Sequence, residues 1–133
     1  MLFQRFAAGA AVASAAIALA AFVVLLTPRL TFEKIYPLTI LWCFAPLVWG
    51  LWALLTPSAW MPKRLPVWGT ILGVIWGALA AFVLNLPSRF FGEAVSLKLR
   101  GAAVIVVALL YYAVWTLVRA AYRLLATVPE RKR

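Results

Sequence analysis

The sequence contains few side chains of the types that perform chemistry. Among its 133 residues are three Asp or Glu, one Cys and no His. Without histidine the chain has no imidazole to ligate haem, to hold a metal ion or to act as a general base. Cys43 lies alone inside an apolar run, where a single thiol commonly serves as a small packing residue. We therefore expect no metal, no cofactor and no disulfide within the chain.

The charged residues that could still act together fall into two loops. Arg29 and Glu33 precede the second apolar run, and Arg89 and Glu93 follow the third. Two carboxylates without a histidine are a small set for an enzyme that acts on lipid. Transport and proton relay commonly need an ionisable group at the membrane midplane, and no Asp, Glu, Lys or Arg lies deep within an apolar run. We expect the chain not to be an enzyme.

The composition is that of a chain surrounded by lipid. It is 67% hydrophobic and 12% charged, with a mean hydropathy of +1.02, and a soluble domain of this length has too little interior to hide so much apolar surface. Four apolar runs are long enough to cross a hydrocarbon core of roughly 30 Å; they are residues 6–27, 36–55, 65–86 and 101–122. We predict an all-α membrane protein in which residues 1–133 form one domain of four transmembrane helices.

The first apolar run has some features of a secretory signal peptide, because Arg5 precedes it and alanine is abundant in it. At about 22 residues, however, it is longer than the usual 7–15-residue apolar region of a signal peptide. We expect it to be a retained spanning helix. In the second run, Pro46 lies near the centre and predicts a kink.

The connection at residues 87–100 predicts a short interfacial helix. At 100° per residue, one narrow face of such a helix carries the polar residues, while apolar residues cover much of the rest. The polar face consists of Arg89, Glu93, Ser96 and Arg100. This helix would lie in the headgroup layer between the third and fourth spans.

An internal repeat with an offset of sixty residues links the two halves of the chain. The six residues Ala18–Val23 recur letter for letter as Ala78–Val83, and the same offset pairs Arg29 with Arg89 and Glu33 with Glu93. Coincidence is the alternative, because the sequence is built from few residue types. The repeat predicts two helical hairpins of the same orientation, related by an axis along the membrane normal.

A stripe of small residues on the third apolar run predicts close helix packing. Gly69, Gly73, Gly77 and Ala81 recur every four residues, which lets another helix backbone approach closely. Two partners are open: the first apolar run, which carries small residues such as Gly9, or a helix of another chain.

Tryptophans mark both the second apolar run and the basic connection after it. Trp42, Trp49 and Trp52 share one helical face, which we expect to contact lipid or a partner protein in preference to forming a ligand cage. Trp60 and Trp68 flank the connection, where indole suits the headgroup layer. Asn85, near the end of the third run, is expected to cap the helix or to make an interhelical hydrogen bond.

The distribution of Lys and Arg predicts the orientation. Eight lie on the side that holds both termini and the middle connection: Arg5, Lys63, Arg64, Arg119, Arg123, Arg131, Lys132 and Arg133. Five lie on the other side: Arg29, Lys34, Arg89, Lys98 and Arg100. The positive-inside rule places the richer side in the cytoplasm of a bacterial-type inner membrane.

The net charge of +10 favours anionic phospholipids as partners and not nucleic acid, because the basic residues lie between apolar runs or at the ends. The residues expected to bind headgroups are Lys63, Arg64, Arg119 and Arg123. Other membrane protein subunits are the expected protein partners, and a homo-oligomer is a further possibility.

Two non-enzymatic functions follow from these patterns. The first is a non-catalytic accessory or structural subunit of a larger membrane complex, acting through helix packing and lipid contacts, with a bundle that is filled at mid-depth. The alternative is a small oligomeric flippase or carrier for a lipid-linked or amphipathic substrate, which the repeat and the basic outer loops favour.

Two families of small four-helix membrane proteins are close in length and layout. Multidrug exporters of this kind depend on an acidic residue in the first helix, and residues 6–27 contain none. Arg5-Phe6 before a small-residue helix resembles the start of small flippases of undecaprenyl-linked sugars, but their Asn-Phe…Asn motif is missing. These residues assign the chain to no family.

Overall fold

The computed structural model describes residues 1–27, 32–91 and 95–127, and over these ranges it contains helices and no strands. The long helices are α1 (Leu2–Leu25), α2 (Phe32–Leu54), α3 (Leu65–Ala78) and α5 (Leu97–Thr127). The short ones are η1 (Ser58–Trp60), the π-helix η2 (Leu79–Val83) and α4 (Leu86–Phe91).

Four helical segments within the described ranges are long and apolar enough to cross a membrane. They are Leu2–Leu25, Tyr36–Leu54, Leu65–Val83 and Leu97–Thr127. The prediction of an all-α, multi-pass membrane protein is therefore confirmed at the level of helix number, length and composition.

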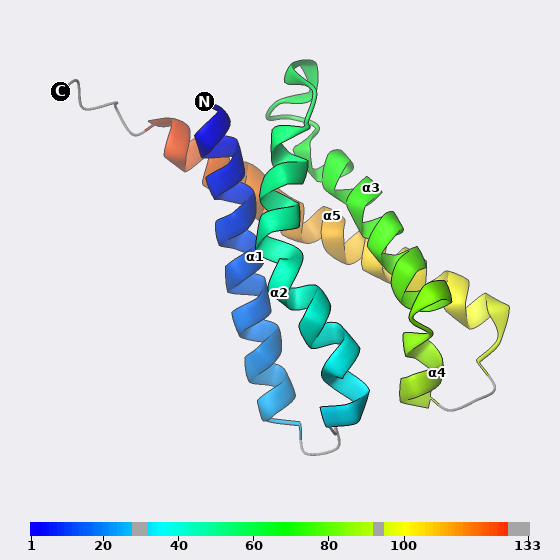
Figure 1. Cartoon of the computed structure of the whole chain (residues 1–133). Coiled ribbons are helices and arrows are strands. Elements are labelled where there is room, and N and C mark those ends of the chain that lie inside the picture. Colours follow the sequence, from blue (N-terminus) through cyan, green and yellow to red (C-terminus); the bar gives the residue numbers. More distant parts are fainter. Residues whose placement is uncertain (28–31, 92–94, 128–133) are drawn as a thin grey trace.

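The long helices pack mainly as two pairs. α1 packs along α2 and α3 packs along α5, while a smaller contact joins α1 to α5. The start of α1, the end of α5 and the connection around η1 lie at the same end of the bundle (Figure 1). At this end Gln4 donates a hydrogen bond to the Leu125 carbonyl at 3.2 Å, and Arg5 donates one to the Thr56 carbonyl at 3.3 Å. We call it the terminal end and the opposite one the distal end.

Small residues set the contact between α1 and α2. A Cβ built on Gly9 would lie 2.6 Å from the Trp49 carbonyl oxygen, and one built on Gly50 would lie 2.5 Å from the Phe6 ring. Each glycine therefore lets the partner helix approach within a distance that no side chain would allow. Both close approaches lie towards the terminal end.

The buried core also lies in the terminal half of the bundle. Its largest fully buried side chains are Trp115, Val118 and Leu65, each with at most 1% of its surface exposed. They come from the second half of α5 and the first turn of α3, and Ala8 of α1 and Trp49 of α2 join the same cluster. The two helix pairs are thus held together near the termini and diverge towards the distal end (Figure 1).

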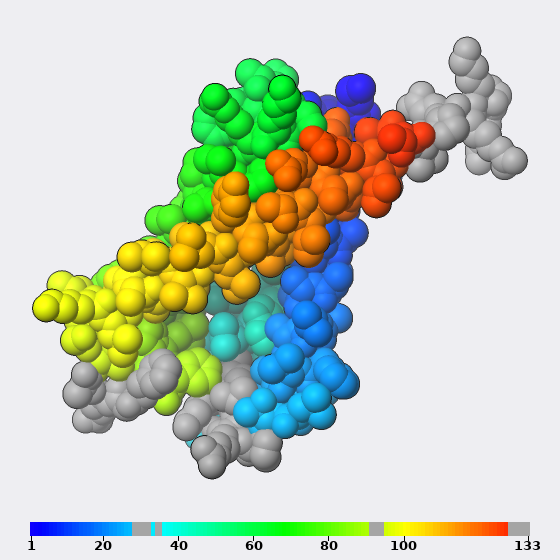
Figure 2. Space-filling model, turned by 180° about the vertical axis from the view of Figure 1, so that it is seen from behind, coloured from blue at the N-terminus to red at the C-terminus, as the bar shows by residue number. Residues whose placement is uncertain are grey.

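Helix α5 is longer than the predicted span. It has 31 residues and extends beyond residues 101–122 at both ends, so at 1.5 Å per residue it is about 46 Å long. A helix longer than the roughly 30 Å hydrocarbon core tilts. α5 accordingly runs obliquely across the other helices, and its outer side forms a ridge over the back of the molecule (Figures 1 and 2).

The π-helix η2 is where the two copies of the repeated segment differ. Leu84 N–H donates to the Leu79 carbonyl at 2.9 Å, an i→i+5 bond, whereas Ala18–Val23 lies in the regular α-helix α1. Asn85 follows with φ 52°, a left-handed conformation that Asn tolerates and that ends helices. Its Oδ1 accepts a hydrogen bond from Ser88 Oγ at 2.9 Å. Asn85 thus separates the third span from α4, a terminating role in line with the predicted cap.

The prediction of one interfacial helix over residues 87–100 is wrong. α4 ends at Phe91, Val95 and Ser96 are not helical, and α5 begins at Leu97. Two of the four residues predicted to share its polar face, Ser96 and Arg100, therefore lie outside α4. The apolar periodicity of the sequence extends over residues 87–100, but the helix does not. The chain leaves the helical conformation between α4 and α5, and periodicity alone does not reveal that break.

Candidate functional site

An open groove lies at mid-depth where the two helix pairs diverge. Three adjoining cavities of about 190, 250 and 430 Å³ share Trp42 and Leu110 in their linings. Two of them also share Ala45 and Tyr111. We call the space between Trp42, Ala45, Trp49, Leu110 and Tyr111, together with its extension towards the distal end, the aromatic groove. Figure 2 shows the molecule hollowed beside α5, with α2 behind the opening.

The position of the groove follows from where small residues stand without a bulky partner. Ala16 and Ala20 of α1 and Ala45 of α2 line the cavities, and none of them fills the space between the pairs. Ala45 is the middle residue of the span Tyr36–Leu54, and Tyr111 lies next to the middle of α5. The groove is therefore at the depth where a spanning helix is farthest from both membrane surfaces. The prediction of a bundle that is filled at mid-depth is wrong at this place.

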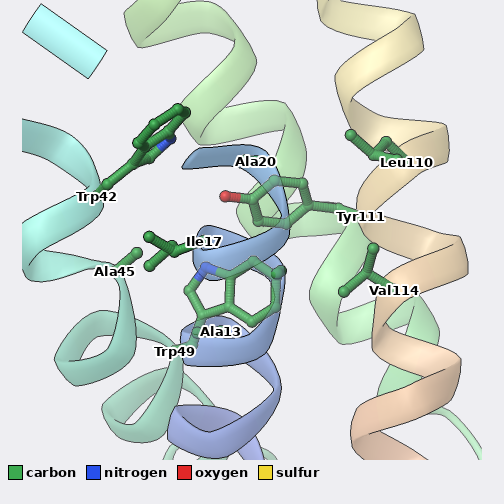
Figure 3. A pocket seen from close by; sticks show the side chains of 10 residues that line it. Ala13, Ile17, Ala20, Trp42, Ala45, Trp49, Leu110, Tyr111 and Val114 are labelled. Atoms are coloured by element: carbon green, nitrogen blue, oxygen red, sulfur yellow. The ribbon is translucent and has the colours of Figure 1, made fainter. Parts of the chain in front are cut away.

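Three aromatic side chains give the groove its shape and its polar atoms. Tyr111 reaches from α5 with its hydroxyl turned towards α2, between Trp42 and Trp49 (Figure 3). The Tyr111 and Trp49 ring centroids are 5.1 Å apart at 57°, and Trp49 also meets Trp115 at 5.8 Å. These are ordinary distances for aromatic pairs, so Trp49 is fixed from two sides.

Two indole N–H groups beside the groove are buried without a partner. Trp49 is 5% exposed, and its Nε1 makes no hydrogen bond to any described residue. The Tyr111 side chain interacts with this indole, but at a geometry poorer than a full hydrogen bond requires. Trp76 Nε1, on the α3 side of the second cavity, is likewise buried and unpaired among the described residues. A buried donor without an acceptor is uncommon in proteins and calls for an explanation.

The lining of the groove is mainly apolar and aromatic. None of the residues that line the three cavities is charged, and the described part of the chain contains no group of three or more His, Cys, Asp or Glu residues. Its walls offer apolar contact, aromatic faces and hydrogen-bond donors. They suit a neutral, apolar ligand.

The three tryptophans of α2 do not share one environment, although they were predicted to share one face. Trp42 lines the groove, Trp49 is buried in the core, and Trp52 is half-buried against Trp68. Trp49 is 5% exposed and lies between the helices beside the groove, so the prediction that it forms part of an outward lipid or partner face is wrong.

Trp52 and Trp68 form a reciprocal pair that joins α2 to α3. Each indole N–H donates to the backbone carbonyl of the other residue at 2.9 Å, and the rings stack with centroids 4.9 Å apart. Trp60 meets Trp68 edge-on at 5.9 Å, and Arg64 lies 5.7 Å above the Trp60 ring. This cluster holds the connection between the two helix pairs at the terminal end.

The glycine stripe faces α5, not α1 as one of the two predictions had it. A Cβ on Gly69 would overlap the Trp115 ring, and one on Gly73 would lie 2.6 Å from Tyr111 Cβ. At Gly77 the nearest atom is Val104 Cα at 3.2 Å. Ala81, the last residue of the predicted stripe, is buried within η2.

A polar network that the sequence did not reveal lies at the distal end. Arg100, in the first turn of α5, donates to the Ala81 carbonyl at 3.2 Å and to Ser88 Oγ at 3.1 Å. It thereby ties α5 to η2 and α4. The sequence hinted at this network only through a basic residue close to a helix start. The carbonyl that accepts the hydrogen bond from Arg100 belongs to Ala81 in the π-helix η2, which the sequence did not predict.

The remaining predicted charges lie at the two ends of the bundle. At the terminal end Lys63, Arg64 and Arg123 are exposed and Arg119 is half-buried, as headgroup contacts require. At the distal end Glu33 and Arg89 are exposed. Arg29 and Glu93 lie outside the described residues.

Comparison with protein-family models, with curated proteins and with solved structures finds no match to this chain.

Proposed function

We propose that this chain is a non-catalytic accessory subunit of a larger membrane complex. The observation that carries the proposal is a continuous apolar stripe on the outer side of α5. Its members are spaced by three or four residues and all are exposed: Ile105, Leu109, Ala113, Leu117, Ala120 and Leu124. We call it the outer stripe.

The outer stripe has the form of a helix-packing surface. Leu109 is 64% exposed and Leu117 is 59% exposed, while Ala113 and Ala120 form notches between them. Small residues two turns apart on one face let another helix approach closely, and large neighbours then fit around it. Since α5 spans the width of the molecule, a partner helix could follow it over several turns.

A bacterial inner-membrane location with both termini in the cytoplasm is part of the proposal. The structure brings the start of α1, the η1 connection and the end of α5 to one end. Five described basic residues belong to that end: Arg5, Lys63, Arg64, Arg119 and Arg123. The positive-inside rule then supports a cytoplasmic position for it.

The two-hairpin duplication is also a proposal. The strongest helix contacts, α1 with α2 and α3 with α5, pair the spans in the order that a duplicated hairpin requires. The π-helix η2 would then be a change that arose in the second copy only.

The proposal is tested by purification in a mild detergent with mass spectrometry of the complex. The expected result is at least one unrelated membrane protein in fixed stoichiometry. Ala113→Trp, which fills a notch of the outer stripe, should release that partner. Ala15→Trp on the exposed side of α1 is the matched control and should retain it. A wild-type chain that purifies alone would contradict the proposal.

The second candidate is a small carrier of an amphipathic or lipid-linked substrate. The open aromatic groove favours it, because a filled bundle would leave such a substrate no place to bind. A chain that purifies alone as a homo-oligomer and moves a labelled lipid across a reconstituted vesicle membrane would support the carrier over the subunit.

A further inference from the structure

We propose that the aromatic groove binds an isoprenoid-tailed quinone, with its ring between Trp42, Trp49 and Tyr111 and its tail along the distal part of the groove. This inference goes beyond the proposed function and does not depend on it. It rests on the size of the groove, on its unpaired donors, on their depth and on the absence of charge.

The inner cavities have the size of a single six-membered ring. A cavity of about 150 Å³ is enough to hold benzene, and those beside Tyr111 measure 190 and 250 Å³. The planar side chains of Trp42 and Trp49 supply faces on which a ring can lie.

The unpaired donors call for a ligand that carries hydrogen-bond acceptors. Trp49 Nε1 and Trp76 Nε1 are buried, and the two residues line the first and the second inner cavity respectively. The Tyr111 hydroxyl lies between α5 and α2 (Figure 3). A buried N–H recovers its lost hydration only when an acceptor reaches it. A quinone ring carries carbonyl oxygens on opposite edges and can serve donors from two sides.

The depth of these donors argues against an ordinary phospholipid as the source of the acceptor. Ala45 and Tyr111 mark the middle of their spans. The ester carbonyls of a phospholipid belong to the interfacial layer outside the hydrocarbon core. A neutral ring on an apolar tail, by contrast, can carry its carbonyl groups to this depth at no cost in charge burial.

The distal part of the groove matches the tail. The third cavity, about 430 Å³, continues from Trp42 past Leu38 and Val23 to Phe90, and Trp42 is the one lining residue with a polar side-chain atom. It opens sideways towards the surrounding lipid, as the hollow in Figure 2 shows. A tail can therefore enter laterally from the bilayer while the ring occupies the inner end.

The test is binding of a short-tailed benzoquinone to the purified full chain in detergent, measured by titration calorimetry. We expect saturable binding near one molecule per chain. Trp49→Phe keeps the ring but removes the N–H, and should weaken binding roughly five- to tenfold, the effect of losing one hydrogen bond. Ala45→Phe places a ring at a position that lines both inner cavities and should abolish saturable binding.

Two measurements keep the outcome interpretable. Trp60→Phe lies outside the groove and should bind as the wild type does. Solvent extraction of freshly purified protein, followed by chromatography, should recover native quinone from the wild type and from Trp60→Phe, but less from Ala45→Phe. If Ala45→Phe fails to fold, comparing the quinone affinity of Trp49→Phe with that of Trp60→Phe still tests the proposal.

Several results would overturn the proposal. They are uptake that does not saturate, equal affinity in Trp49→Phe and wild type, and a groove found to hold phospholipid acyl chains or a partner's helix. Loss of protein partners in Ala113→Trp with quinone binding intact would leave this proposal standing and bear only on the subunit assignment.

Discussion

Adding one methyl group to glycine should have opposite effects at two positions of this chain. A Cβ on Gly73 of α3 would lie 2.6 Å from Tyr111 Cβ, 2.8 Å from Tyr111 Cγ and 3.2 Å from Ala108 Cα. None of these atoms is the flexible end of a side chain, so α3 and α5 must move apart. A Cβ on Gly101 would meet nothing within 4 Å.

The expected change in the free energy of unfolding comes from overpacking at Gly73 and from helix propensity at Gly101. Inserting a carbon into a close-packed contact costs typically about 1–3 kcal/mol, and α3 with α5 is the most extensive helix contact in the described structure. Glycine inside a helix is about 0.5–1 kcal/mol less favourable than alanine. We expect Gly73→Ala to lower the free energy of unfolding by about 1–3 kcal/mol and Gly101→Ala to raise it by up to about 1 kcal/mol.

The assay is reversible unfolding of the purified chain in mixed micelles by added dodecyl sulfate, followed by circular dichroism. Gly73→Leu should extend the series and be more destabilising than Gly73→Ala. If Gly73→Ala is neutral or stabilising, α3 does not meet α5 through its glycine stripe, and the pairing of helices described above is wrong. A loss of stability in Gly101→Ala would refute the helix-propensity argument and would leave the pairing of α3 with α5 untouched.

Three further predictions concern the ends of the bundle. Trp68→Phe should cost about 1 kcal/mol in the same unfolding assay, because the N–H that binds the Trp52 carbonyl is lost, and Trp52→Phe added to it should cost less than an independent loss. Arg100→Gln should cost about 1–3 kcal/mol by leaving the Ala81 carbonyl short of a partner, whereas Lys98→Gln, at an exposed site, should change little. A C-terminal reporter that is active only in the periplasm should be inactive, and its activity there would reverse the proposed orientation.

The number and approximate place of the spanning helices could be predicted because hydropathy is a local property of the sequence. Residues 6–27 and 36–55 overlap α1 and α2 almost fully, and residues 65–86 cover α3 and η2. The fourth span was underestimated because Leu97–Arg100 and the turn after Tyr122 carry charge while remaining helical. Charge excludes these residues from the hydrocarbon core, but it does not end a helix.

The partner of the glycine stripe could not be predicted from the stripe itself. Small residues at every fourth position show that a backbone can approach, and they are equally compatible with any neighbouring helix. The choice of α5 depends on the bulky side chains that cover the gaps, Trp115 over Gly69 and Tyr111 over Gly73. That complementarity lies some forty residues along the chain and becomes visible only once α3 and α5 are side by side.

The prediction that the three tryptophans of α2 form one surface failed for a related reason. Positions 42, 49 and 52 share a direction on a helical wheel, but the neighbours of α2 change along its length because the helix pairs diverge. The same face meets open space at Trp42, the core at Trp49 and another tryptophan at Trp52. A helical wheel assumes one environment for the whole helix, and this bundle does not provide one.

The location of the groove can be traced to how large and small residues are matched along the helices. In the terminal half two glycines face bulky side chains: Gly50 faces the Phe6 ring and Gly69 faces the Trp115 ring. Towards the distal end the small residues of α1, Ala16 and Ala20, line a cavity in place of meeting a large side chain. The closed terminal half and the open distal half therefore have the same kind of small-residue surface. The distal half differs in that, within the described part of the chain, no large side chain of the neighbouring helix pair packs against its small residues. Supplying one, as Ala45→Phe would do, should close the groove without disturbing the core beneath it.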